Sequence, residues 1–351
     1  MARLVLIAPG RGSYNRGELG YLRRFSEHPA FPRRQQLFDR ADALRDALGR
    51  PTISLMDGAE AYSPALHLPG ENASSLIFTC SAADRALISQ DHRIAAVLGN
   101  SMGWYTTLFS GGALDFDNAF QVVETMAHFQ KRNIRGGQII YPVVDDNWLP
   151  RPDLEAEVHR LMEDLAREEQ TWVGLSIRLG GFLVLAGTDQ GLKQLLNRLP
   201  KIRMGPNDYP FQLPRHSAFH TKLMREASDN GLYLLHNIHW KQPTIPMIDG
   251  RGHIWGPHHT DPQTLKSYTL QHQVLEPFDF SRAVRVALRE YNPDHLVLLG
   301  PGETLGGAIA QVMIAERWRG IDSREAFKQA QQSETPPLIA MNRPDQARLV
   351  I

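Results

Sequence analysis

Short apolar runs followed by glycine-containing loops recur along the chain. Largely apolar runs occupy residues 4–8, 94–98 and 295–299, and Gly or Pro-Gly follows closely after each of them. Runs of this length without polar alternation are typical of strands that are buried on both faces of a sheet. They predict the parallel sheet of an α/β core, with tight loops where the strands end.

Helical periodicity appears between these runs. We expect one helix over residues 74–87, a second directly after Gly103, and a third that is capped by Asp115 or Asp117. The third helix places one apolar stripe on a single face: Ala119, Val122, Val123, Met126 and Phe129.

The hydrophobic pattern changes after about residue 133. A helical stripe over residues 154–165 follows Pro152-Asp153, and two strand-like runs follow at 172–177 and 182–186. Another helix is expected from Gly187 to about Leu199. Helix, strand, strand and helix with local connections predict a small α+β subdomain inserted into the larger core.

The domain boundaries follow from these changes. We expect the core to comprise residues 1–136 and 214–325, and the small subdomain to comprise residues 137–213. Residues 326–351 are polar, contain Pro336-Pro337, and are expected to form a C-terminal tail with little core.

Composition narrows the possible classes. The 351 residues are 42% hydrophobic, and 38 basic residues balance 38 acidic ones. This balance argues against a protein that coats nucleic acid and against a polybasic membrane binder. No apolar run reaches the ~18 residues of a membrane span, so we expect a cytoplasmic protein. Cys80 is the only cysteine, which excludes an internal disulfide and a cysteine-based zinc site.

The motif with the clearest chemistry is Gly99-Asn100-Ser101-Met102-Gly103, placed between a predicted strand and a predicted helix. A serine at such a sharp turn projects its hydroxyl from the edge of the sheet, and flanking glycines allow close backbone packing. The N–H groups at the start of the helix point toward an oxyanion that develops nearby. The pattern predicts Ser101 as a nucleophile.

A nucleophilic serine needs a base, and the chain offers 14 histidines. Six of them lie between His236 and His272, but no Asp or Glu spacing around His258-His259 forms a recognised ligand set. We therefore expect no metal site. The residue pattern alone does not select the base among these histidines.

Several segments together resemble the malonyl-CoA:acyl-carrier-protein transacylase family, whose members include the acyltransferase domains of fatty-acid and polyketide synthases. The order and spacing match over about residues 3–315. The matching segments are Pro9–Ser13, Gly99–Gly103, Ser217–His220 with Leu223-Met224, Gln273 within His272–Pro277, and Leu299–Gly302 with Leu305 and Gly307.

This resemblance implies an α/β-hydrolase-like core with an inserted ferredoxin-like subdomain. It implies a Ser–His dyad in which Ser101 attacks a thioester, His220 is the base, and the backbone carbonyl near Gln273 orients His220. The backbone N–H groups of Arg11 and Met102 would form the oxyanion hole. The implied substrates are acyl-CoA and the phosphopantetheine thiol of an acyl carrier protein, with no bound cofactor, in a monomer or weak dimer.

Departures from the family bear on the substrate. By gap-free counting from Ser101, Met126 stands where the malonyl enzymes carry an arginine for the free carboxylate. Asn100 replaces a histidine and Trp104 a glutamate, and we place both in the substrate pocket with Met126 and Phe219. Without the arginine, a buried carboxylate loses a charge-assisted partner. We therefore expect an uncharged acyl group rather than malonyl.

Alternatives remain open at this point. Arg11 replaces the family's glutamine and could supply the missing carboxylate ligand, and Met126 could be a plain core residue. The acyl-serine could be hydrolysed by water, which would make the protein a proofreading thioesterase for carrier proteins. A catalytically silent partner protein is a third class, and the intact Ser101 and His220 argue against it.

Overall fold

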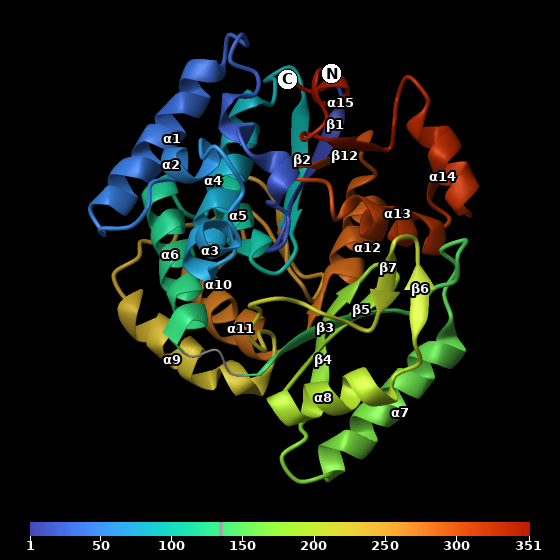
Figure 1. The fold of residues 1–351 in the computed structure, drawn as a ribbon. Coiled ribbons are helices and arrows are strands. Elements are labelled where there is room, and N and C mark those ends of the chain that lie inside the picture. The colour runs from blue at the N-terminus through green and yellow to red at the C-terminus, as the bar shows by residue number, and fades with distance from the viewer. Residues whose placement is uncertain (133–135) are drawn as a thin grey trace.

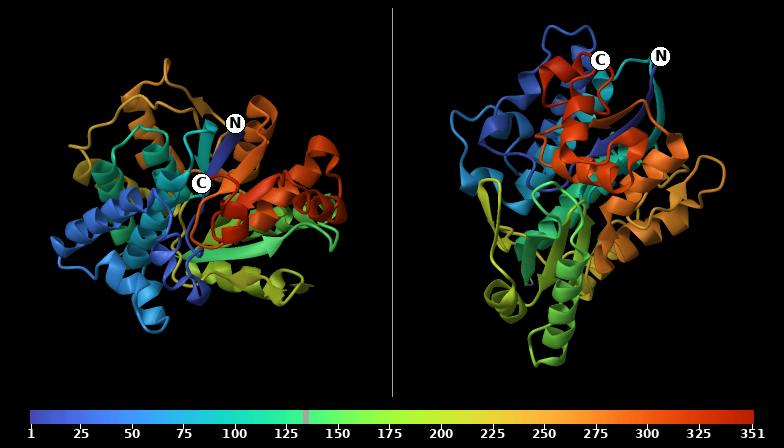
Figure 2. Two further views of the ribbon diagram at one scale, coloured as in Figure 1. Left: turned by 90° about the horizontal axis from the view of Figure 1, so that it is seen from above. Right: turned by 90° about the vertical axis from the view of Figure 1, so that its right-hand side faces the viewer.

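A computed structural model describes residues 1–132 and 136–351. The chain forms a larger α/β body and a smaller subdomain with its own sheet (Figure 1). Both termini lie at the same end of the larger body, away from the subdomain (Figures 1 and 2). No helix in the described part of the chain has the length and apolarity needed to cross a bilayer.

The three apolar runs form the centre of the main sheet. Its strand order is β10-β9-β2-β1-β12-β13, parallel throughout except for β10. The strands are β1 (Arg3–Ala8), β2 (Arg93–Gly99), β9 (Met247–Ile248), β10 (Ile254–Trp255), β12 (His295–Leu298) and β13 (Leu338–Ala340). The predicted parallel α/β sheet is confirmed.

Helices cover both faces of this sheet because alternate residues of each strand point to opposite sides. Leu4 and Leu6 pack into the core under α1, α4, α5 and α6, whereas Val5 and Ile7 pack into the core under α12 and α13. The helices of the larger body are α1 (Phe31–Asp46), α2 (Ile53–Asp57), α3 (Pro64–His67), α4 (Gly70–Leu87), α5 (Gly103–Ser110), α6 (Phe116–Arg132), α9 (Arg225–Leu234), α10 (Pro262–Ser267), α11 (Gln273–Leu275), α12 (Phe280–Tyr291), α13 (Gly306–Ala315), α14 (Arg324–Gln331) and α15 (Pro344–Ala347).

Short helical turns connect these elements. They are the 3-10 turns η1 (Arg16–Glu18), η2 (Tyr21–Arg23), η3 (Lys222–Met224) and η5 (Trp318–Gly320), and the π-helical turn η4 (Tyr268–His272). The turns η3 and η4 lie directly beside the site described below.

The small subdomain has a sheet of its own, with strand order β11-β4-β5-β3-β8. Its elements are β3 (Gly137–Pro142), α7 (Pro152–Arg167), β4 (Val173–Leu179), β5 (Phe182–Gly187), α8 (Asp189–Arg198), the hairpin β6 (Ile202–Met204) and β7 (Asn207–Tyr209), and β8 (Phe211–Gln212). The order β4-β5-β3-β8 and the antiparallel pairings correspond to a ferredoxin-like sheet. The strand β11 (Phe278–Asp279) of the larger body extends this sheet beside β4.

The last 26 residues differ from the expected tail (351 − 325). The strand β13 pairs in parallel with β12, and Ile339 and Val350 are fully buried. A strand of three residues after Pro336-Pro337 is too short to show a periodic pattern, so its place in the sheet depends on tertiary pairing.

The hydrophobic pattern of the polar N-terminal stretch does not predict helix α1, because the buried face of α1 includes two arginines. Arg34 and Arg45 are fully buried and pair with Asp84 and Glu124 of α4 and α6, respectively. A charged residue on the inner face removes the apolar periodicity from which helices are predicted.

Asp84 connects three segments around the site. It is fully buried and accepts hydrogen bonds from Nη1 of Arg34 at 2.6 Å, from the hydroxyl of Tyr21 at 2.6 Å and from the N–H of Gly300 at 2.8 Å. Burial and the Asp84 carboxylate together raise the pKa of Tyr21 well above its usual value. These bonds fix the loop after β12 against the N-terminal segment.

Replacing Asp84 tests this network. Asp84→Ala leaves Arg34 buried without its anion, and we expect it to lower the free energy of unfolding by about 3–5 kcal/mol. Asp117→Ala removes the anion of an exposed pair with Arg40 and should cost far less, because solvent screens that pair. Urea denaturation measures both values. Equal losses would contradict the importance of the buried network.

Candidate active site

Ser101 lies on a sharp turn between β2 and α5. Its φ of 54° is in the left-handed region, which residues other than glycine rarely adopt. A Cβ on Gly99 would lie 2.2 Å from the carbonyl carbon of Gly103, and a Cβ on Gly103 would lie 2.3 Å from the carbonyl oxygen of Ala8. Both glycines are therefore required for the turn to pack against the end of β1.

His220 is brought to Ser101 from a position 119 residues away in the chain. Oγ of Ser101 and Nε2 of His220 are 2.7 Å apart, and Nδ1 of His220 is 2.6 Å from the carbonyl oxygen of Gln273. Since a carbonyl can only accept, Nδ1 carries the proton and Nε2 is free to accept the serine proton. His220, like Ser101, has a positive φ, of 63°. The Ser101 and His220 side chains therefore both rest on strained backbone.

Burial sets the protonation state of this base. Desolvation lowers the pKa of His220 to about 4, and the hydrogen bond to Gln273 opposes this shift. The imidazole is therefore neutral at neutral pH and able to act as a base.

Gln273 contributes its side chain as well as its carbonyl. Its Nε2 donates to the backbone carbonyl of Ser101 at 3.1 Å, and its Oε1 accepts from the hydroxyl of Tyr105 at 3.4 Å. Gln273 thus orients the His220 ring and anchors the turn that carries Ser101. The motif comparison predicts the carbonyl but not the side-chain contacts.

Two further buried polar residues position the histidine from the subdomain. Oγ of Ser176 donates to the carbonyl of Phe219 at 2.9 Å, and Nε2 of Gln138 donates to Oγ of Ser176 at 2.8 Å. Both side chains are at most 4% exposed. Sequence reasoning missed them, although a serine within the apolar run 172–177 was a visible signal.

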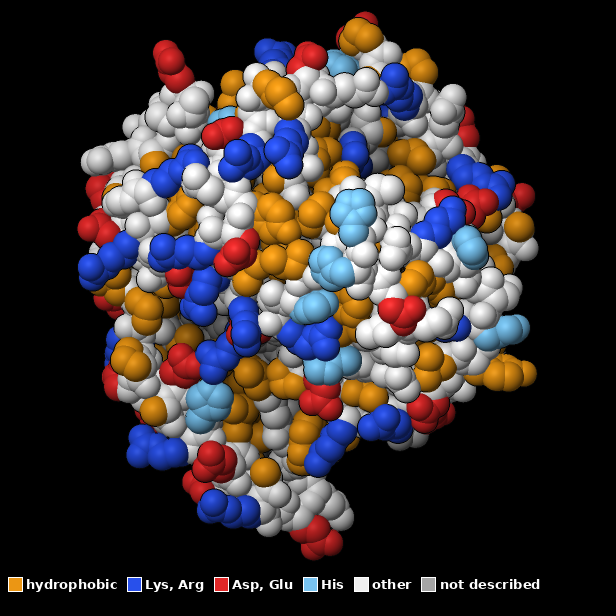
Figure 3. Space-filling view, turned by 180° about the vertical axis from the view of Figure 1, so that it is seen from behind, with side chains coloured by type: hydrophobic (Ala, Val, Ile, Leu, Met, Phe, Trp, Pro, Cys, Tyr) orange, Lys and Arg blue, Asp and Glu red, His pale blue; other side chains and the backbone are white. Residues whose placement is uncertain are grey.

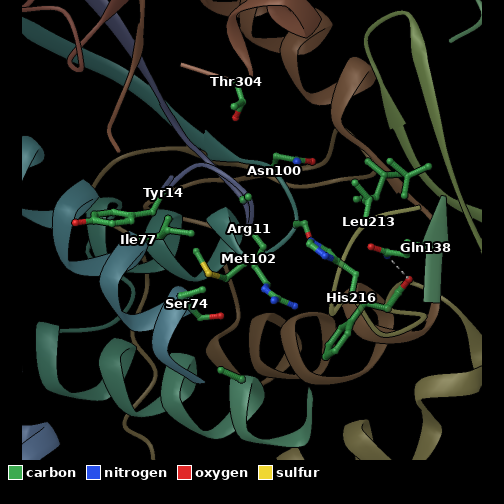
Figure 4. A pocket seen from close by; sticks show the side chains of 18 of the residues that line it. Arg11, Tyr14, Ser74, Ile77, Asn100, Met102, Gln138, Leu213, His216 and Thr304 are labelled. Carbon is green, nitrogen blue, oxygen red and sulfur yellow. Dashed lines mark hydrogen bonds between the residues drawn. The ribbon is translucent and has the colours of Figure 1, made fainter. Parts of the chain in front are cut away.

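A cavity of about 420 Å³ opens beside Ser101, between the larger body and the subdomain (Figure 4). Helices α4, α5 and α6 line one half with Ala73, Ser74, Ile77, Tyr105, Val123, Met126 and Ala127. The subdomain and the chain that leaves it line the other half with Gln138, Ile140, Ile177, Leu179, Val184, Phe211 and Leu213. In the described chain, no group of three His, Cys, Asp or Glu side chains could hold a metal ion.

Most of the predicted pocket residues line this cavity. Asn100, Met126 and Phe219 all do so. Met126 is 1% exposed, and its Sδ lies 2.9 Å from the position of a Cβ on Gly231, so it packs between α6 and α9. Oδ1 of Asn100 is buried and has no hydrogen-bond partner among the described residues.

Trp104 differs from the prediction, because it does not line the cavity that the described residues form. Its indole donates to Oγ1 of Thr269 at 2.9 Å, and its ring packs edge-on against Tyr268 at 5.2 Å. Trp104 follows Ser101 by three residues, and its side chain lies on the face of α5 that packs against η4. It supports the segment that carries Gln273 and does not form part of the cavity wall.

The two predicted oxyanion donors come from adjoining loops. Met102 precedes the first turn of α5, where backbone N–H groups have no partner within the helix. The loop that carries Arg11 approaches closely, since a Cβ on Gly10 would lie 2.7 Å from the carbonyl oxygen of Asn100. Arg11 and Met102 both line the cavity next to Ser101. The oxyanion hole stays a prediction.

The Arg11 side chain also reaches the cavity (Figure 4). Its Nη1 donates to the carbonyl of Arg215 at 2.9 Å and its Nη2 to the carbonyl of Leu68 at 3.3 Å. Desolvation lowers the pKa of Arg11 to about 10, and Glu71 opposes this shift, so the side chain remains a cation at neutral pH. Burial and the Arg11 charge lower the pKa of the neighbouring His216 to about 3, which keeps it neutral.

Known proteins of similar sequence are malonyl CoA-acyl carrier protein transacylases. The Bacillus subtilis (strain 168) protein is 24% identical over 318 residues, covering 89% of this chain and 91% of the relative. The Escherichia coli (strain K12) protein is 23% identical over 317 residues, covering 89% and 94%, respectively. No protein-family model matches the chain. These relatives confirm the resemblance that the motifs predict.

Solved structures confirm the fold. The acyl-carrier-protein S-malonyltransferase of Burkholderia pseudomallei 1710b has a TM-score of 0.75 at 20% identity, covering 99% of this chain and 98% of the other. A malonyl-transacylase in complex with its type II PKS acyl-carrier protein has a TM-score of 0.74 at 18% identity, with the same coverage. The α/β core with its small subdomain is therefore the fold of these proteins.

The lowered pKa of His220 predicts the pH dependence of any reaction that begins with proton transfer from Ser101. A protonated imidazole cannot accept the serine proton, so kcat/KM should stay level from pH 8 to about pH 5.5 and fall by half near pH 4. A half-loss near pH 6.5 would contradict the buried, neutral base. The melting temperature over the same range is the control, because it shows whether the protein is still folded where activity is lost. His220 and His216 have lowered pKa values in the folded state, so the unfolded chain is protonated first and the stability falls as the pH drops from 6.5 toward 4.

Proposed function

We propose that this chain, a divergent relative of the malonyl CoA-acyl carrier protein transacylases, transfers an acyl group from acyl-CoA to the phosphopantetheine thiol of an acyl carrier protein. The transfer passes through an acyl-Ser101 intermediate. The observation that carries this proposal is a pair of hydrogen bonds through the His220 ring, one to Oγ of Ser101 and the other to the carbonyl of Gln273. A fatty-acid or polyketide assembly pathway is the corresponding context.

Acylation begins with proton transfer from the Ser101 hydroxyl to Nε2 of His220. Oγ attacks the thioester carbonyl, and the resulting oxyanion accepts hydrogen bonds from the N–H groups of Met102 and Arg11. The tetrahedral intermediate expels the CoA thiolate, which takes the proton from the imidazolium. In the second half-reaction the carrier thiol gives its proton to His220 and attacks the acyl-serine, which regenerates the hydroxyl.

A backbone carbonyl is a sufficient orienting group for this chemistry. The Gln273 carbonyl fixes the tautomer of His220 and places a negative dipole end next to the imidazolium when it forms. It does so without burying a carboxylate, which would be costly in this dry position.

The cavity is consistent with a thioester that extends to both sides of Ser101. Its helical half, with Met126, suits the acyl chain, and the subdomain half suits the pantetheine arm. The unpartnered Oδ1 of Asn100 can accept a hydrogen bond from an amide N–H of that arm. Lys, Arg and His side chains gather around an apolar strip on the face opposite to that of Figure 1, and such a surface suits anionic partners (Figure 3).

An uncharged acyl group fits this cavity best. Met126 offers no charge to a carboxylate and is 1% exposed, so a malonyl carboxylate beside it would be desolvated without a partner. The guanidinium of Arg11 is the remaining candidate ligand, and its two terminal nitrogens already donate to backbone carbonyls.

The product distinguishes transfer from hydrolysis. With acetyl-CoA and a holo acyl carrier protein, a transferase yields acyl carrier protein carrying the acetyl group. A proofreading hydrolase, using the same acyl-Ser101, yields free acetate at a rate that the carrier thiol does not lower.

Substitution of the dyad tests the proposed intermediate. Ser101→Ala should abolish the acyl adduct that intact-mass spectrometry detects after mixing with acetyl-CoA, because no other nucleophile is proposed. His220→Ala should slow adduct formation by at least ~10², the usual contribution of a positioned base. His258→Ala, at an exposed histidine, should form the adduct normally. A normal yield in Ser101→Ala would end this mechanism.

Position 126 tests the substrate charge. The unmodified protein should load acetyl from acetyl-CoA faster than malonyl from malonyl-CoA. Met126→Arg should raise malonyl loading by about 10–100-fold relative to acetyl, the range for a hydrogen bond to a charged group. Met126→Leu, which keeps the wall apolar, should retain the original preference.

Two results would contradict the preference for a neutral acyl group. Equal loading of acetyl and malonyl in the unmodified protein would remove the electrostatic basis. Efficient malonyl loading that disappears in Arg11→Gln would assign the carboxylate to Arg11.

A further inference from the structure

The hydroxyl of Ser74 is a buried polar group in the cavity wall. Ser74 lies on α4, is 1% exposed, and has no hydrogen-bond partner for its Oγ among the residues that the structure describes. Figure 4 shows its side chain directed toward the part of the pocket where the Arg11 guanidinium ends. A buried hydroxyl without a partner is destabilising, and a ligand that supplies the partner removes this cost.

Three other hydroxyl groups of α4 have hydrogen-bond partners within the protein. Oγ of Ser75 donates to the carboxylate of Glu124 and lies 3.1 Å from the carbonyl of Glu71, and Oγ1 of Thr79 donates to the carbonyl of Ser75 at 2.8 Å. Oγ of Ser81 donates to the carbonyl of Gly300. These hydroxyls therefore have partners within the protein, whereas the hydroxyl of Ser74 has none among the described residues and faces the cavity.

The polar groups near Ser74 have partners of their own. The hydroxyl of Tyr14 donates to Asp57 at 2.7 Å, both ring nitrogens of His67 lie 2.9 Å from backbone carbonyls, and the hydroxyl of Tyr105 donates to Gln273. The rest of this half is apolar, with Ile77, Val123, Met126 and Ala127. A plain alkyl chain would fill this half and leave Oγ of Ser74 unsatisfied.

We infer that the acyl group on Ser101 carries a neutral oxygen substituent, a hydroxyl or keto group, that hydrogen-bonds to Ser74. This inference rests on the proposed acyl transfer and adds the substrate class. The serine hydroxyl can donate to either group. A single hydroxyl is too little to compensate a desolvated carboxylate, which makes a neutral substituent the better match.

Matched four-carbon thioesters test this inference. We would measure kcat/KM for acyl-Ser101 formation, by quenched-flow intact mass, with butyryl-, 3-hydroxybutyryl-, 4-hydroxybutyryl- and acetoacetyl-CoA, and with malonyl-CoA. At least one of the oxygenated four-carbon chains should load about tenfold faster than butyryl, the value of one net hydrogen bond. In Ser74→Ala this ratio should fall to about one.

Ser75→Ala is the matched control. It removes a hydroxyl one residue further along α4 that bonds to Glu124 of α6 and to the carbonyl of Glu71, and that does not line the cavity. It should lower the melting temperature yet keep the tenfold ratio. Ser74→Ala should not lower the melting temperature, because its hydroxyl makes no hydrogen bond in the described structure.

Three outcomes would overturn the inference. They are equal loading of oxygenated and plain chains in the unmodified protein, a ratio that persists in Ser74→Ala, and malonyl loading that exceeds all four-carbon chains. Failure of the proposed function looks different, because no thioester would then produce an acyl-Ser101 adduct.

Discussion

The hydrogen bond between Nδ1 of His220 and the carbonyl of Gln273 is the interaction on which the site depends. It sets the tautomer of the base, and the same glutamine holds the backbone of the nucleophile turn through its side chain. Ser176 and Gln138 fix the adjacent carbonyl of Phe219 from the subdomain. The geometry of Ser101 and His220 therefore depends on contacts from both the larger body and the subdomain.

The cavity wall combines an apolar region with a positively charged side chain. The helix side chains around Met126 are largely apolar, whereas the partly buried Arg11 places a cation near the same space. Arg11 also links the first loop of the core to the chain that leaves the subdomain, through the carbonyl of Arg215. Its guanidinium therefore holds these two segments together without a substrate, and the hydroxyl of Ser74 is one of the neutral polar groups that face the cavity without a partner in the described structure.

Sequence patterns predict the parts of this site that are local. The strand, the turn and the helix around Ser101 follow from a single stretch of chain. His220 is selected only through the resemblance, because its partner lies 119 residues away and 13 other histidines compete (14 − 1). Ser176, Gln138 and the burial of Arg34 depend on partners from distant elements. Trp104 was misplaced because spacing along the chain does not determine which face of α5 meets η4.

The kinetic order of transfer tests the acyl-serine account most directly. Initial rates of transfer from acetyl-CoA to pantetheine should be measured while both concentrations are varied. If acyl-Ser101 forms and CoA leaves before the second thiol reacts, double-reciprocal plots are parallel at every pantetheine concentration. Intersecting lines, which indicate that both thiols must be bound before any acyl group moves, would contradict the account.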